Sequence, residues 1–151
     1  MPAYRNGPVS SIVRRHANNH RAMPSYYDPN LSPDADVWLL LDERDRISQA
    51  EKYHKKRGIR LPNTKAHATF HAIIENKIAE GEDSVVRAMD RLFKQGLGRH
   101  DSIHAIAWVM SQHIFELMSA ENPDDKDVMN AQYVAAVERL TADDWRNQES
   151  E

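Results

Sequence analysis

Two pairs of histidines have a spacing that lets neighbouring imidazoles act together. They are His67/His71 and His100/His104, and each pair has the pattern His-x-x-x-His. Residues four apart lie one above the other on a single face of an α-helix, so both rings of a pair can reach one cation or one cavity. The spacing therefore predicts a metal-binding or catalytic site, provided that both segments are helical.

The two motifs also have similar local sequences and could share one site. Glu75 follows His71 at the same interval and extends the first motif to His-x-x-x-His-x-x-x-Glu. Two helices facing each other would supply four nitrogens and one carboxylate. Zinc would accept a closed set of four nitrogens, whereas iron or manganese would need the carboxylate and an open position. A closed set indicates a structural ion, and an open one an ion that polarises a substrate or activates water.

The apolar residues around each pair predict helices whose buried face includes the histidines. In the first motif Phe70, Ile74 and Ile78 centre the apolar stripe, and both histidines lie at its edge. The second motif repeats this arrangement around an isoleucine-rich stripe. Trp108 and Phe115 lie beside the second pair on the helical wheel, and we expect both to shield it from water.

A structural role for the histidines stays open as the alternative. Each ring could be satisfied by a backbone carbonyl or by a nearby acid, Glu75 or Asp101, in a non-enzymatic interaction or scaffold module. A third pair, His16/His20, shows that the spacing also arises elsewhere. His54 is explained by the favourable position of a cation at a helix end, although it could also approach the site as a fifth ligand. His113 lies on the opposite flank of its helix and is expected to be incidental.

Residues typical of helix starts, apolar stripes with helical spacing and glycines typical of helix ends follow one another along the chain. Their order predicts an all-α, single-domain bundle of about five helices. Residues 1–30 are expected to be a flexible basic arm, residues 31–142 the bundle, and residues 143–151 a charged tail. Gly58, Gly81 and Gly96 are the predicted stops. The expected helices cover residues 33–57, 64–80, 83–94, 99–119 and 124–140.

Composition restricts the class of protein and its partners. The chain has 151 residues, a formal net charge of −3 and no cysteine, so disulfides and thiolate metal sites are excluded. No apolar run approaches the length that spans a bilayer, and we expect a cytoplasmic protein. Four arginines and no acid precede Asp28, which leaves the rest of the chain acidic. Nucleic acid is therefore an improbable partner, and an exposed helix stripe would favour a homo-oligomer.

Several segments together resemble an uncharacterised bacterial family, domain of unknown function 1841. They are Trp38-Leu-Leu-Leu-Asp-Glu-Arg, Tyr53-His54, His67-x-x-x-His71 and Arg99-His100-Asp-x-x-His104-Ala-Ile. The likeness covers residues 33–117 and implies a small helical bacterial protein in which the four histidines of the two pairs are motif positions. This chain departs from the family pattern at Asp101-Ser102, which puts any role of the intervening acid in doubt. The resemblance implies no reaction.

Overall fold

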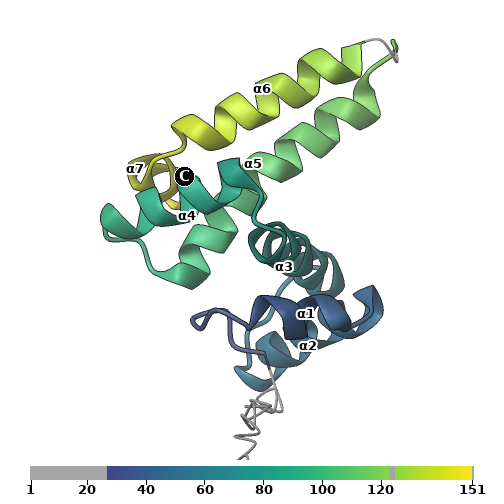
Figure 1. Ribbon diagram of the computed structural model, residues 1–151, viewed down its shortest axis with the longest axis vertical. Coiled ribbons are helices and arrows are strands. Elements are labelled where there is room, and N and C mark those ends of the chain that lie inside the picture. The colour runs from purple at the N-terminus through teal and green to yellow at the C-terminus, as the bar shows by residue number, and fades with distance from the viewer. Residues whose placement is uncertain (1–26, 123–124, 151) are drawn as a thin grey trace, which may run out of the picture.

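The computed structural model describes residues 27–122 and 125–150, and these residues form seven α-helices and no strand (Figure 1). The all-α class is thus confirmed, whereas the expected number of about five helices is wrong. The helices are α1 (Ala35–Leu40), α2 (Glu43–Lys56), α3 (Thr64–Ala79), α4 (Asp83–Lys94), α5 (Arg99–Ser119), α6 (Lys126–Arg139) and α7 (Ala142–Glu149).

The helices that carry the two histidine pairs lie where the sequence predicts them. Asn63 caps α3 by accepting a hydrogen bond from the Ala66 amide at 3.0 Å. Gly81 follows α3 with a φ of 72°, a left-handed conformation that a residue with a Cβ adopts only with strain. The α5 helix starts directly after Gly98 and runs for 21 residues. Both pairs are therefore on helices, as their spacing requires.

The helix expected over residues 33–57 is two helices. Asp42 has an extended backbone (φ −71°, ψ 162°), and its side chain accepts a hydrogen bond from the Asp45 amide at 2.8 Å. It therefore caps a new helix in the middle of the predicted one. The start also shifts from residue 33 to Ala35, because Asp34 is the capping residue of α1.

The segment expected as a charged tail is mostly helix α7. Thr141 and Asp144 form a reciprocal capping box, in which each side chain accepts a hydrogen bond from the other residue's backbone amide. Trp145 is 9% exposed and packs into the core. One buried indole thus anchors a helix whose other residues are largely polar.

The last residues of the expected arm are packed rather than free. Tyr27 is 5% exposed, and Pro29 is fully buried. The Tyr27 amide donates to the Gln49 side chain at 3.1 Å. Residues 1–26, and with them the His16/His20 pair, lie outside the described part of the chain.

The core has two parts that meet at α3. The larger one lies among α3 to α7 and includes Ile74, Leu92 and Ile106, and the smaller one lies between α1, α2 and α3 around Trp38 and Ala68. Figure 1 shows α3 between the α1–α2 pair and the remaining helices, with α5 and α6 forming an antiparallel hairpin. None of the described helices is both long and apolar enough to cross a membrane.

Candidate metal centre

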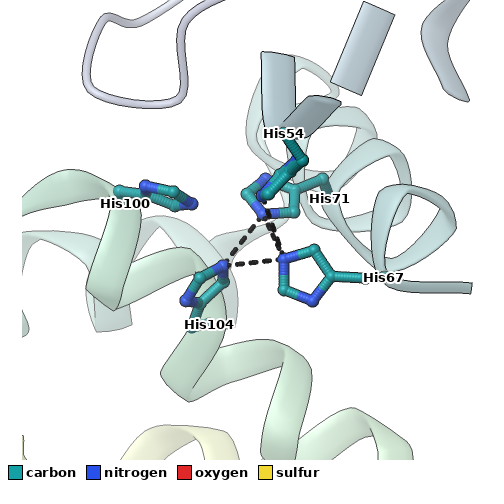
Figure 2. Close-up of side chains that lie close together, drawn as sticks. All are labelled: His54, His67, His71, His100 and His104. Atoms are coloured by element: carbon teal, nitrogen blue, oxygen red, sulfur yellow. Dashed lines mark hydrogen bonds between the residues drawn. The ribbon is translucent and has the colours of Figure 1, made fainter. Parts of the chain in front are cut away.

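Five histidine side chains converge where the two parts of the core meet (Figure 2). One comes from the last turn of α2, two from the first half of α3 and two from the first two turns of α5. We call this group the histidine cluster: His54, His67, His71, His100 and His104. One nitrogen from each ring lies within 4.8 Å of the nitrogens of all the others. The structure thus brings both predicted pairs together and adds His54.

Three of the nitrogens form a nearly equilateral triangle. The Nε2 atoms of His67, His71 and His104 are separated by 3.2, 3.0 and 3.1 Å, and the Nε2 atom of His54 lies 3.1 Å from that of His67. Nitrogens bound about 2.1 Å from one ion are about 3.0 Å apart at a right angle and about 3.4 Å apart in a tetrahedron. The triangle therefore has the dimensions of one face of a coordination shell.

Hydrogen bonds on the far side of two rings fix which nitrogen carries the proton. The Nδ1 atom of His54 lies 2.7 Å from the carbonyl oxygen of Ala50, which only accepts, so this nitrogen must be the donor. Tyr27 gives its only hydroxyl proton to Glu75 at 2.6 Å, so its oxygen accepts from Nδ1 of His71 at 3.3 Å. Both rings consequently direct the lone pair of Nε2 into the cluster.

Glu75, expected as a carboxylate ligand, bonds to Arg99 and Tyr27 rather than lying among the converging nitrogens. Its two oxygens accept from the two terminal nitrogens of Arg99, both at 2.7 Å, and one of them also accepts from Tyr27. The Glu75 carboxylate is 1% exposed, and Arg99 balances its charge. Arg99 also donates to the carbonyl of Pro29 at 2.9 Å, which holds residues 27–29 against the site. The carboxylate is outside the group of converging nitrogens.

Burial and mutual repulsion keep four of the five rings neutral by lowering their pKa values. Burial, followed by the positive charges that neighbouring histidines would carry, lowers the pKa of His67 to about 4 and that of His104 to about 3. The same causes lower the pKa of His71 and of His100. Burial and the Glu75 carboxylate raise the pKa of Tyr27, which therefore remains a donor. At neutral pH each of these four rings has one nitrogen lone pair.

The Nε2 atom of His100 is buried and has no hydrogen-bond partner among the described residues. A buried polar atom without a partner costs about 1–3 kcal/mol, and an ion at the cluster would remove that cost if this nitrogen were bound to it.

The dimensions of the cluster suit one ion. Opposite ligands of one ion lie about 4.2 Å apart, close to the 4.8 Å span of the cluster, whereas a pair of ions 3.5–4 Å apart would need a wider shell.

A pocket of about 290 Å³ opens beside the triangle. His67, His71 and His104 line one side of it, and Phe70, Trp108 and Trp145 line much of the rest. Trp108 thus lies in the same pocket as His104 of the second histidine pair. Phe115 does not, because it is 72% exposed and lies at another surface hollow.

The residues that sequence reasoning missed are the supports, Tyr27 and Arg99. Arg99 directly precedes His100, and its place in the resembling motif was the one available signal. Tyr27 lies in a segment without periodicity, which carried no signal. His113 is apart from the cluster, as expected, since it stacks on Tyr133 and bonds to Asn130 at 3.0 Å.

Comparison with known proteins found no matching family model, curated protein or solved structure.

Proposed function

We propose that this chain is a metal-binding protein that holds one divalent transition-metal ion in the histidine cluster. The triangle of Nε2 atoms at 3.0–3.2 Å is the observation that carries the proposal. His54 adds a fourth nitrogen, and His100 lies near enough to become a fifth. His67, His71 and His104 also line the pocket, so an ion held by these three nitrogens and His54 could take a further ligand from the pocket by expanding to five-coordination.

Counting protons separates this proposal from a structural role for the histidines. Four close contacts join Nε2 atoms of the histidines: His54 to His67, His67 to His71, His71 to His104 and His67 to His104. His54 and His71 have their protons on Nδ1, so only His67 and His104 have a proton available for Nε2. Two protons serve at most two of the four contacts, and the others would place lone pair against lone pair. One cation at the centre satisfies all of the lone pairs together.

Zinc fits this donor set better than the other ions considered. Imidazole nitrogens suit zinc and iron, whereas manganese prefers carboxylate and water oxygens. Arg99 and Tyr27 occupy the Glu75 carboxylate, and among the described residues the converging group contains only histidines. Neutral ligands leave the full charge of the ion to act on whatever binds at the open position. The resemblance to domain of unknown function 1841 remains a prediction and supplies no reaction for this centre.

Calorimetry on protein purified without a histidine tag and stripped of metal tests the proposal. We expect one zinc ion per chain and a stabilisation of about 2.7 kcal/mol when free zinc is 100 times its dissociation constant. His104→Ala should weaken zinc binding about 100-fold or more, because it removes one corner of the triangle. His113→Gln is the matched control, since it removes a buried histidine of α5 that lies apart from the cluster.

Two results would overturn the proposal. One is a protein that neither binds zinc or iron stoichiometrically nor gains thermal stability from them. The other is equal loss of affinity in the His104 and His113 variants, which would show that the binding is not at the cluster.

A further inference from the structure

The pocket beside the triangle has the character of a small-molecule site, and its position depends on the proposed metal centre. Three of its lining residues are the histidines of the triangle, so a molecule in the pocket would lie against the open side of the ion. Phe70, Ala107 and Trp108 contribute apolar surface. The pocket therefore joins an apolar wall to a metal position.

The lining residues restrict the chemistry of an occupant. No lysine, arginine, aspartate or glutamate of the described chain lines this pocket. Ser111 gives its hydroxyl proton to the carbonyl of Trp108 at 2.7 Å, which leaves Gln148 as the main polar group free to contact a ligand. An occupant therefore has no charged side chain to pair with, and the ion is its strongest polar partner.

Trp145 provides a second sign of a missing partner. This side chain lines the pocket and is only 9% exposed, and its indole N–H has no hydrogen-bond acceptor among the described residues. A buried donor of this kind is normally satisfied by protein, water or ligand.

The volume sets the size of the occupant. Ligand pockets usually measure about 300–1,000 Å³, and an apolar cavity of about 150 Å³ holds one benzene molecule. At about 290 Å³ the pocket admits one or two small rings, or a short branched chain, but not a nucleotide or a peptide.

We propose that the open side of the metal centre binds a small, mainly apolar molecule through a single metal-coordinating donor atom, with the apolar part against Phe70, Trp108 and Trp145. The donor atom takes the free position on the ion, and the wall contributes affinity in proportion to the apolar area that it covers. This inference rests on the proposed metal centre and names the class of ligand that the centre accepts.

The test compares imidazole with 4-phenylimidazole, two probes with the same donor and different apolar parts. Cobalt is loaded in place of zinc so that its visible spectrum reports coordination, and metal content is measured first. We expect 4-phenylimidazole to bind at least about 10-fold more tightly than imidazole, because the phenyl group is removed from water.

Variants of the wall locate the effect. Ala107→Phe should fill the pocket and abolish the advantage of the phenyl probe while metal binding persists. Ala135→Phe, at an exposed position of α6, is the matched control and should keep the advantage. Trp108→Ala is a second test that adds no bulk, and it should reduce the advantage at least about 3-fold by removing apolar wall.

The outcomes separate the two proposals. A protein that binds no metal overturns the metal centre and this inference with it. A protein that binds cobalt but does not distinguish the two probes overturns the inference alone. Equal effects of the Ala107 and Ala135 variants would also overturn it, because the phenyl group would then bind somewhere else.

Discussion

At the scale of single residues, Glu75 illustrates how a carboxylate can lie beside a proposed metal site and bond to neighbouring side chains instead. The sequence places Glu75 on the same helix edge as His67 and His71, which made it a candidate ligand. Whether it binds an ion or a neighbouring side chain depends on Arg99 and Tyr27, which lie 24 and 48 positions away. Periodicity describes one helix at a time and carries no information about such distant partners. The histidine pairs were predictable because their spacing is local.

Tyr27 should set the affinity of the centre without contributing a ligand. Tyr27→Phe removes the hydroxyl that accepts from His71 and donates to Glu75, so the ring of His71 loses its fixed proton position. We expect zinc affinity to fall about 10- to 100-fold in calorimetry. Tyr53→Phe is the matched control, because Tyr53 packs edge-on against His54 and its hydroxyl bonds to Asn30 instead. Unchanged affinity in the Tyr27 variant would contradict this role.

The histidines should also make the metal-free protein sensitive to acid. Unfolded histidine has a pKa of about 6.5, whereas the folded pKa is about 4 for His67 and about 3 for His104. Between those values the unfolded state binds more protons, so the free energy of unfolding is highest above pH 6.5 and falls as the pH decreases. The free energy of unfolding changes by at most about 1.4 kcal/mol per pH unit for each ring. Solvent screening reduces this change because both rings are partly exposed.

Urea denaturation at pH 7.5 and pH 5.0 measures this effect. The double variant His67→Gln/His104→Gln should show a flatter dependence than the natural chain. Equal or greater stability of the natural chain at pH 5.0 would refute the expectation.

At the scale of elements, the errors of prediction come from short helices with strong caps. The sequence from Leu39 to Arg44 has the pattern of a helix interior. Asp42 nevertheless interrupts the helix, because its side chain accepts a hydrogen bond from the Asp45 amide. The α7 helix has eight residues and buries only Ala142 and Trp145, so it shows no apolar period. The longer helices α3 and α5 were predictable because each repeats its apolar stripe over several turns.

The capping box of α7 should contribute measurably to stability. Thr141→Ala removes the hydroxyl that accepts from the Asp144 amide, and we expect a loss of about 1 kcal/mol in urea denaturation. Thr69→Ala, in the middle of α3, is the control and should cost little, because its hydroxyl bonds back to the Lys65 carbonyl and caps no helix end. Equal losses in both variants would contradict a capping role.

At the scale of the whole molecule, the all-α class followed from the sequence, but the division into two cores did not. Apolar stripes show which face of a helix is buried without showing which helix covers it. The α3 helix contributes to both cores, and this shared use places its histidines between α2 and α5. The convergence of both pairs was therefore a hypothesis that only the packing could test.

The origin of the histidine cluster from three helices has a consequence for the order of folding events. His54 lies 13 positions from His67, and His104 lies 33 positions from His71. The proposed zinc site is complete only after α2, α3 and α5 have docked, so we expect the bonds to zinc to form after the rate-limiting barrier. We then expect nearly the whole zinc-induced increase in the free energy of unfolding to appear as a slower unfolding rate. The refolding rate should stay almost unchanged. Stopped-flow folding with and without zinc distinguishes this from an ion that nucleates folding, which would accelerate refolding instead.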